Sequence, residues 1–224
     1  MYCAGSYAAE AIASVFAQTV LPAELIVVDD GSEDDSASHA SQALEQGDPQ
    51  VKASLIRMPH RGQAASRNTA LSHASCEWIF YLDADDVLLP DALESLLAAA
   101  EEHPEAGMVC SRCQDFISPD LTEEEAAKLK INPDPYQRML AGCTLIRHSV
   151  YDLVGKYDES LPSSETAQWM LRMKDAGVVT VNIDAVTLMR RYHRTNFGRR
   201  DRKTQLASYM AIIKQRKAQR DAKS

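Results

Sequence analysis

The chain has 224 residues, of which 45% are hydrophobic and 25% charged, and its formal net charge is −8. This length can bury a sizeable core, and the composition excludes collagen-like, low-complexity and wholly disordered proteins. No stretch approaches the ~18 consecutive apolar residues of a membrane-spanning helix, and the first residues lack the pattern of a signal peptide. An odd number of cysteines, five, favours reduced thiols over a disulfide framework. We therefore expect a cytoplasmic globular protein.

The first half of the chain alternates helical and strand patterns. Helices are predicted over 7–19, 35–46, 63–74 and 90–102, and strands over 25–28, 51–57, 78–82 and 107–110. Further along, the pattern predicts helices over 123–129 and 164–176, and one or two strands within 178–188. This alternation predicts an α/β fold with a mostly parallel sheet and helices on both faces. In such sheets, ligands bind beyond the carboxyl ends of the strands.

The charge is distributed unevenly along the chain. Residues 190–224 contain twelve Lys or Arg and two Asp or Glu, a net charge of +10, and the rest of the chain carries −18. Such a basic segment either lies on an anionic membrane surface or forms a solvated terminal helix. Few aromatic side chains accompany the cations, so we expect no nucleic-acid binding.

Two acidic residues follow the predicted strand 25–28. Asp29 and Asp30 precede Gly31 and Ser32. A carboxylate at a strand end can accept a hydrogen bond from a nucleotide base N–H or a ribose hydroxyl. The alternative is a tight Asp-Gly turn, which these residue types favour by themselves. The motif alone leaves both alternatives open.

Three more acidic residues, Asp83, Asp85 and Asp86, follow the predicted strand 78–82. Three carboxylates beside a buried edge cost free energy unless a cation compensates their charge. Mg²⁺ and Mn²⁺ are natural partners, because they bind carboxylate and phosphate oxygens together. The alternative is a turn in which the Asp side chains cap the helix that begins near Pro90.

Arg67 lies within the small-residue helix predicted over 63–74. Its guanidinium could meet a phosphate, a nucleotide base or one of the acidic residues. The last of these would be an internal salt bridge.

These motifs, taken in order, resemble the nucleotide-sugar-binding half of a family 2 glycosyltransferase with the GT-A fold. The segments that carry the resemblance are 2–7, 11–19 (AIASVFAQT), 27–32 (VVDDGS), 62–68 (GQAASRN) and 81–86 (YLDADD). Residues 142–147 and 155–161 resemble the acceptor half of that family. The resemblance implies one domain over 1–195, with halves at 1–110 and 111–195, followed by a basic C-terminal helix over 196–224.

The resemblance also implies a donor site. Tyr2, Asp29, Asp30, Arg67 and Asp83 would bind the nucleotide sugar. Asp30, with Asp29 beside it, would contact the base, Arg67 would line the same pocket, and Asp83 would approach the ribose.

A metal site is implied as well. Asp85, in the family's DXD motif, would hold the Mn²⁺ or Mg²⁺ that bridges the diphosphate. His193 stands where some relatives place a histidine near the metal or diphosphate; the alternative is an ordinary surface histidine.

The base position departs from the family pattern. Inverting transfer needs a base to deprotonate the acceptor hydroxyl. Many relatives carry Glu-Asp shortly before a Trp, with the Asp as base, whereas this chain has Glu165-Thr166 before Trp169. Threonine is a poor general base. The role would then fall to Glu165 or to Asp158, or activity is weak or absent.

The start of the chain departs as well. Relatives begin with an apolar strand, central in the sheet, before the position of Tyr2. We expect this first strand to be missing, through N-terminal truncation or a mis-assigned start codon. Its two neighbours would then lie roughly 9–10 Å apart or pair directly.

The sequence therefore predicts an inverting, metal-dependent glycosyltransferase of polysaccharide biosynthesis. Its donor would be a UDP-, GDP- or dTDP-linked sugar, and its acceptor a glycan, a lipid-linked sugar or a small molecule. Peripheral contact of 190–224 with the inner face of the membrane would suit a lipid-linked acceptor. The alternatives are a catalytically impaired nucleotide-sugar-binding or regulatory protein on the same fold and, less favoured, a nucleotidyltransferase.

Overall fold

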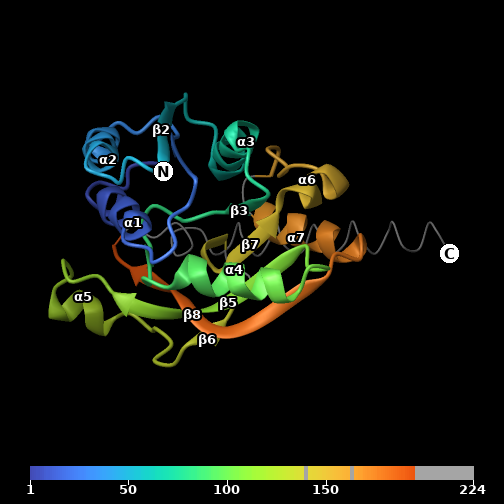
Figure 1. Ribbon diagram of the computed structural model, residues 1–224. Helices are drawn as coiled ribbons and strands as arrows, with labels where there is room; N and C mark the ends of the chain where they lie inside the picture. Colours follow the sequence, from blue (N-terminus) through green and yellow to red (C-terminus); the bar gives the residue numbers. More distant parts are fainter. Residues whose placement is uncertain (139–140, 162–163, 195–224) are drawn as a thin grey trace.

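The computed structural model describes residues 1–138, 141–161 and 164–194, and Figure 1 shows how its elements are arranged. The helices are α1 (Tyr7–Phe16), α2 (Ser36–Glu45), α3 (Gln63–His73), α4 (Ala92–Glu102), α5 (Glu123–Ala127), α6 (His148–Val154) and α7 (Glu165–Asp175). The strands are β1 (Glu24–Asp29), β2 (Lys52–Arg57), β3 (Trp78–Phe80), β4 (Val87–Leu88), β5 (Met108–Ile117), β6 (Tyr136–Gln137), β7 (Thr144–Arg147) and β8 (Thr180–Tyr192), with a 3₁₀ turn at Ala141–Cys143. The predicted basic helix over 196–224 lies outside the described residues.

Each helix and strand predicted within the described residues is present, and the differences concern length and short elements. β5 continues to Ile117 instead of ending near residue 110, and the region 178–188 belongs to one long strand, β8. These two strands pair from Met108 opposite Thr180 to Ile117 opposite Tyr192, and this long-range pairing extends both of them. The prediction missed β4, β6, β7 and α6, which are too short to show a clear periodicity.

The strands form two sheets. β1 and β2 pair in parallel, whereas the larger sheet has the order β3-β7-β5-β8-β4, with β6 added to β5. In the larger sheet β5 and β8 are parallel, and the pairings of the short strands are antiparallel. The α/β prediction is confirmed. Its mostly parallel pairing holds for β1–β2 and β5–β8, but not for β3, β4, β6 and β7.

Helices cover these sheets at several places and supply the core. α2 and α3 contact β1, and α4 packs on β5 and β8. Leu96 of α4 is fully buried in a cluster with Val109 of β5 and Leu145 of β7. A second cluster joins Trp169 of α7 to Tyr151 of α6 and to β5. This cluster fixes the helix that carries the candidate base against the sheet.

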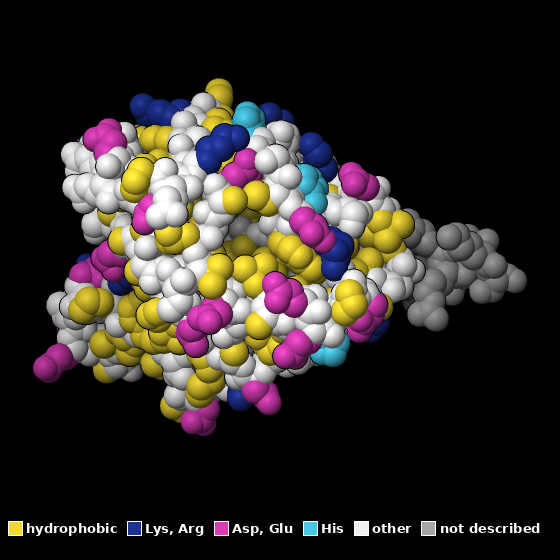
Figure 2. All heavy atoms as spheres, in the orientation of Figure 1, with side chains coloured by type: hydrophobic (Ala, Val, Ile, Leu, Met, Phe, Trp, Pro, Cys, Tyr) yellow, Lys and Arg dark blue, Asp and Glu magenta, His cyan; other side chains and the backbone are white. Residues whose placement is uncertain are grey.

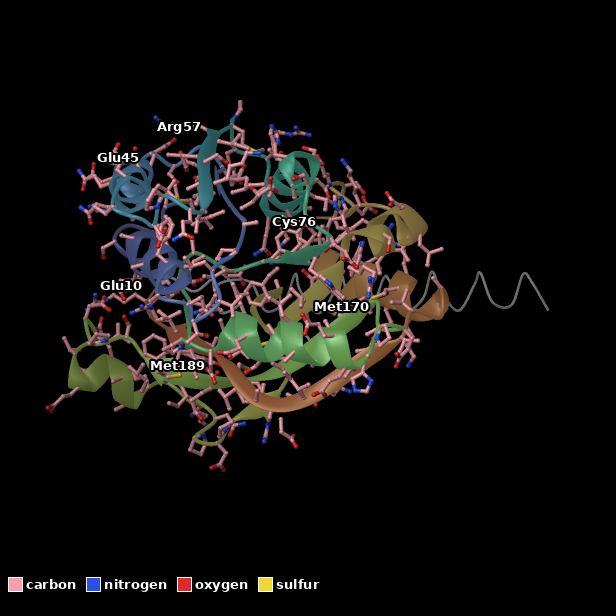
Figure 3. All side chains as sticks on the ribbon, viewed as in Figure 1. Glu10, Glu45, Arg57, Cys76, Met170 and Met189 are labelled. Carbon is pink, nitrogen blue, oxygen red and sulfur yellow. The ribbon has the colours of Figure 1, made fainter. Side chains whose placement is uncertain are left out.

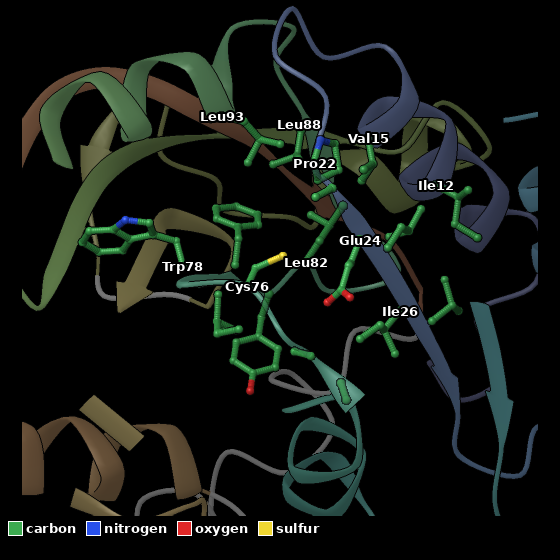
Figure 4. Close-up of a pocket in the computed structure, with 18 of the residues that line it drawn as sticks. Ile12, Val15, Pro22, Glu24, Ile26, Cys76, Trp78, Leu82, Leu88 and Leu93 are labelled. Atoms are coloured by element: carbon green, nitrogen blue, oxygen red, sulfur yellow. The ribbon is translucent and has the colours of Figure 1, made fainter. Parts of the chain in front are cut away.

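An apolar cavity of about 420 Å³ lies between β1 and β3. Its walls include Leu25, Val27, Ile79, Phe80 and Leu93. Figure 4 shows side chains from β1, α1 and α4 turned toward it, and Figure 2 shows hydrophobic side chains around a hollow near the middle of the molecule. In the described part of the chain, no strand pairing joins β1 to β3. The two sheets therefore meet across apolar side chains rather than through backbone hydrogen bonds.

Met1 lies beside β1 as a strand residue would. Its amino group donates to the carbonyl oxygen of Val28 at 2.6 Å, and the amide of Asp30 donates to its carbonyl oxygen at 2.9 Å. A residue that pairs in parallel with Asp29 makes these two bonds. At the carboxyl end of β1, the backbone groups that face the cavity are therefore already hydrogen-bonded to Met1.

Candidate active site

The start of α3 lies between the two acidic motifs and contacts both. Gly62 donates its backbone N–H to Asp30 Oδ2 at 2.8 Å, and Gln63 Nε2, one residue later, donates to Asp83 Oδ1 at 3.1 Å. The loops after β1 and β3 therefore meet at the same edge, as the sequence predicts for carboxyl ends of strands in an α/β sheet.

Asp30 holds the loop over 60–62 at this edge. Its carboxylate accepts the backbone N–H of Arg61 at 2.8 Å as well as that of Gly62, lies 2.9 Å from His60 Nδ1, and is 4% exposed. Gly31 makes this approach feasible, since its φ is +75° and a Cβ there would lie 2.8 Å from the backbone nitrogen of His60. Asp30 therefore shapes the loop over 60–62 besides any contact it makes with a ligand.

Asp29 is fully buried and its contacts shape the same region. It accepts the backbone N–H of Ser32 at 3.1 Å and Arg57 Nε at 3.3 Å. Arg57 ends β2, beside β1 (Figure 3). These bonds give Asp29 a structural role at the turn, which was the alternative for this motif.

Tyr2 and His60 form an exposed aromatic pair next to Asp30. Their rings are stacked with centroids 4.1 Å apart, and Tyr2 is 48% exposed. An exposed flat ring beside buried polar groups can receive another planar ring by stacking. The predicted donor residue Tyr2 thus lies close to the predicted base contact, Asp30.

Arg67 links the donor side to the acceptor side. It is 7% exposed, and its guanidinium forms ion pairs with Asp83 Oδ1 at 3.2 Å and Glu165 Oε1 at 3.1 Å. Burial alone would lower the pKa of Arg67, but the carboxylates of Asp83 and Glu165 and the phenol of Tyr157 raise it. The salt-bridge alternative for Arg67 is therefore present, and it joins two residues that the sequence placed in one site.

Glu165 and Thr166 both contact Arg67 at the first turn of α7. Arg67 Nη1 donates to Thr166 Oγ1 at 2.5 Å, and the Thr166 hydroxyl lies 3.2 Å from Glu165 Oε1. Glu165 is 7% exposed. Asp158, the other candidate base, accepts instead from the backbone N–H and hydroxyl of Ser160, which lower its pKa. Of the two candidate bases, Glu165 contacts Arg67 and Asp158 instead contacts Ser160.

Asp85 and His193 come together although 108 residues separate them. His193 Nε2 lies 2.9 Å from Asp85 Oδ2, and the His193 ring packs on Tyr7 with centroids 4.8 Å apart. No group of three or more metal-ligating side chains occurs within the described residues. The pair fits an ion that takes its other ligands from a diphosphate and water, as Mg²⁺ commonly does, rather than an all-protein cage.

Asp86, which the sequence did not assign a separate role, fastens β8 to this turn. It is 6% exposed and accepts the backbone N–H of Arg191 at 2.8 Å. Burial, together with the charges of Asp85 and Asp83, raises its pKa well above the usual range. The Arg191 side chain also donates to the carbonyl oxygen of Asp85 at 2.9 Å. These bonds bring the end of β8, and with it His193, to the acidic turn.

A family model described as Glycosyl transferase family 2 matches residues 1–153 of the chain. The chain is 39% identical over 182 residues to the UDP-Glc:alpha-D-GlcNAc-diphosphoundecaprenol beta-1,3-glucosyltransferase WfgD of Escherichia coli, covering 76% of this chain and 66% of that protein. It is 38% identical over 93 residues to the GalNAc(5)-diNAcBac-PP-undecaprenol beta-1,3-glucosyltransferase of Campylobacter jejuni, covering 42% and 30%. The matched region spans 30% to 39% of the length of three of its curated relatives.

Solved structures of similar fold include one from S. aureus and one from Pyrobaculum calidifontis. Residues 1–349 of TarS from S. aureus, in complex with UDP, give a TM-score of 0.68 at 18% identity, covering 86% of this chain and 58% of that one. The mannosyltransferase PcManGT from Pyrobaculum calidifontis, in complex with GDP-Man and Mn²⁺, gives 0.66 at 17% identity, covering 88% and 56%. At such identities these likenesses establish the fold, which is the GT-A fold.

Proposed function

Because the chain belongs to glycosyltransferase family 2, we propose that it transfers a sugar from a nucleotide-diphospho-sugar to an acceptor hydroxyl, with inversion at the anomeric carbon. The observation that carries this proposal is the buried Arg67, which pairs with Asp83 on the donor side and Glu165 on the acceptor side. The family match favours sugar transfer over the nucleotidyltransferase alternative.

On the donor side, the nucleotide base would lie against the Tyr2–His60 pair, near the loop that Asp30 holds. Asp83, whose side chain is 39% exposed, would accept a hydrogen bond from a ribose hydroxyl. UDP is the first nucleotide to test, since the Escherichia coli relative is named for UDP-Glc and the TarS structure contains UDP. GDP- and dTDP-sugars remain alternatives.

Asp85 and His193 would hold Mn²⁺ or Mg²⁺ together with the diphosphate. Such an ion supplies positive charge that stabilises the leaving nucleoside diphosphate. The contribution of the chain is to place the two ligands: Asp86 binds the backbone of Arg191, and the Tyr7 ring packs against His193. The Mn²⁺ in the PcManGT structure supports this choice of ion.

Glu165 would serve as the base that takes the proton of the acceptor hydroxyl. Its carboxylate is held at one oxygen by Arg67 and Thr166, which leaves the other oxygen to approach the acceptor.

Two relatives are named for substrates linked to undecaprenol, and this supports a lipid-linked sugar as the acceptor. No helix in the described part of the chain has the length and apolarity to cross a membrane. The basic residues of 190–224 would attract the anionic membrane surface in which such a lipid lies.

A catalytically impaired nucleotide-sugar-binding protein is the second candidate. It is favoured by Thr166 at the position where the family pattern has the base, and by the ion pair that engages Glu165. This candidate retains donor binding and lacks transfer.

Calorimetry with UDP-glucose, GDP-mannose and dTDP-glucose, with and without Mn²⁺, tests the donor site. If none of them binds, the proposal is wrong. Release of nucleoside diphosphate from the bound donor then separates the two candidates. Glu165→Gln should lower that release by about 10²- to 10⁴-fold without changing donor affinity. Glu45→Gln, at an exposed helix end, is the matched control. Donor binding without release by the wild type favours the impaired protein.

A further inference from the structure

Asn68, the residue after Arg67 on α3, binds the main chain of the acceptor half. Its Oδ1 accepts the backbone N–H of Tyr157 at 2.9 Å, and its Nδ2 donates to the carbonyl oxygen of Tyr157 at 2.9 Å. Asn68 is 8% exposed and Tyr157 is 5% exposed. The side-chain amide thus pairs with one residue of the 155–161 segment as a neighbouring strand would, inside the protein.

The same amide also reaches a carboxylate that ties the donor loop to this segment. Asn68 Nδ2 donates to Glu159 Oε1 at 2.8 Å, and Arg61 Nη2 donates to Glu159 Oε2 at 2.6 Å. Arg61 is the residue whose backbone N–H is bound by Asp30. A continuous set of hydrogen bonds therefore runs from the donor loop through Glu159 to Asn68.

From Tyr157 the contacts continue to α7. The rings of Tyr157 and Trp169 lie 5.5 Å apart, and Trp169, which is fully buried, donates its indole N–H to the carbonyl oxygen of Gly155 at 2.7 Å. Trp169 lies one helical turn after Glu165. The position of Glu165 thus depends on where the segment with Tyr157 is held.

We propose that Asn68 is a positioning residue, which acts through Tyr157 and Trp169 to hold Glu165 at the distance from the donor site that transfer requires. This inference rests on the proposed function. It separates the roles of two adjacent residues on α3: Arg67 neutralises the carboxylates, and Asn68 fixes the main chain that carries the acceptor side.

Asn68→Asp tests this role with little change in size. The carboxylate can still accept from the Tyr157 N–H, but it cannot donate to the Tyr157 carbonyl, and it repels Glu159. We expect UDP release from UDP-glucose in the presence of Mn²⁺ to fall by about 10- to 100-fold, as a misplaced catalytic group predicts. The dissociation constant for UDP should change by less than about twofold, because Asp30 still holds the donor loop through the backbone N–H groups of Arg61 and Gly62.

Two variants separate positioning from general damage. Glu159→Gln alone keeps an acceptor oxygen for Asn68 Nδ2 on a side chain that is 37% exposed, so its rate should stay within about threefold of the wild type. The double variant N68D/E159Q exchanges the amide and the carboxylate, so it should regain about fivefold over N68D. Equal release by N68D and the wild type, or a UDP affinity that falls in step with the rate, would overturn the proposal.

Hydrogen exchange gives a readout that does not depend on turnover. N68D should speed amide exchange in 155–161 and at α7 but leave that of β1 unchanged. Unchanged exchange in those two segments refutes the positioning role, and so does faster exchange throughout the chain. If the wild type neither binds nor cleaves any donor, the proposed function fails, while the exchange result still decides whether Asn68 holds α7.

Discussion

An apolar strand added before Met1 is expected to stabilise the protein by joining its two sheets. Asp30 N–H and Val28 C=O already bond to Met1, so they define the side of β1 that faces the added strand. Because peptide groups of alternate residues point to the same side of a strand, those of Ile26 face that side too. A strand that continues backward from Met1 would pair with Ile26 and Val28 and enter the apolar cavity.

The expected gain in stability comes from burial of apolar side chains in the cavity and from backbone hydrogen bonds with β1. Five appended apolar residues would each gain about 1.5–3 kcal/mol from burial and about 1 kcal/mol from hydrogen bonding. Ordering each residue costs about 1.5–3 kcal/mol of backbone and side-chain entropy. The net gain is about 1 kcal/mol per residue, or about 5 kcal/mol in all. At about 2–4 °C per kcal/mol for a chain of this size, the melting temperature should rise by about 10–20 °C.

The assay compares thermal melts of three proteins. One is the chain described above, the second carries Val-Ile-Val-Val-Ile before Met1, and the third carries the same segment with proline at its centre. Proline cannot donate a ladder hydrogen bond, so it should abolish most of the gain. Hydrogen exchange should slow at Ile26 and Val28, and change little at Val27, which faces β2. The reasoning is refuted if the apolar segment raises the melting temperature no more than its proline version.

Three other predictions concern single residues. Arg67→Met leaves Asp83 and Glu165 without their cation and should lower the free energy of unfolding in urea by about 3 kcal/mol. Lys128→Met, at an exposed position, is the control. A loss below about 1 kcal/mol for Arg67→Met would contradict the central role of Arg67. Gly31→Ala should lower the free energy of unfolding by about 2–4 kcal/mol, because the new Cβ combines a positive φ with a contact at 2.8 Å to the backbone nitrogen of His60. Gly5→Ala has a positive φ but open space around the Cβ, so it should cost about 1–2 kcal/mol. Equal costs would show that the contact with His60 is unimportant. Hydrogen bonds from Ser75 are the main cause that lowers the pKa of Glu24 from 4.5 to about 2, so the stabilisation from Glu24 is complete above pH 4.5 and is lost as the pH falls toward 2. Ser75→Ala should therefore reduce the loss of stability between about pH 5 and pH 2.5, and an unchanged pH dependence would refute this assignment.

The local patterns of the sequence predicted most elements and one edge of the site. The strand that ends at Asp29 and the strand before Asp83 both lead into acidic turns, and the pattern correctly predicted that these turns meet, although the two strands belong to different sheets. The short strands β4, β6 and β7 escaped prediction because two to four residues carry little periodicity of their own. They form only because β8 and β5 offer them hydrogen-bonding edges.

Within the site, the sequence identified residue types but not their partners. The third acid of the 83–86 turn, Asp86, gave no signal of its bond to Arg191, 105 residues later. Asn68 stood in a recognised motif, yet its pairing with the main chain of Tyr157 depends on how the acceptor half folds back.

By itself, the sequence determined the α/β class, the order of the main helices and strands, and the family, because these depend on local periodicity and on motifs of adjacent residues. The tertiary structure decided which charges meet. It placed Arg67 between Asp83 and Glu165 and brought His193 to Asp85. It also showed that Asp158 binds Ser160 within a local turn. The Arg67–Glu165 and Asp85–His193 pairs join segments about a hundred residues apart, so only tertiary packing sets the distances on which their ion pairing and any proton transfer depend.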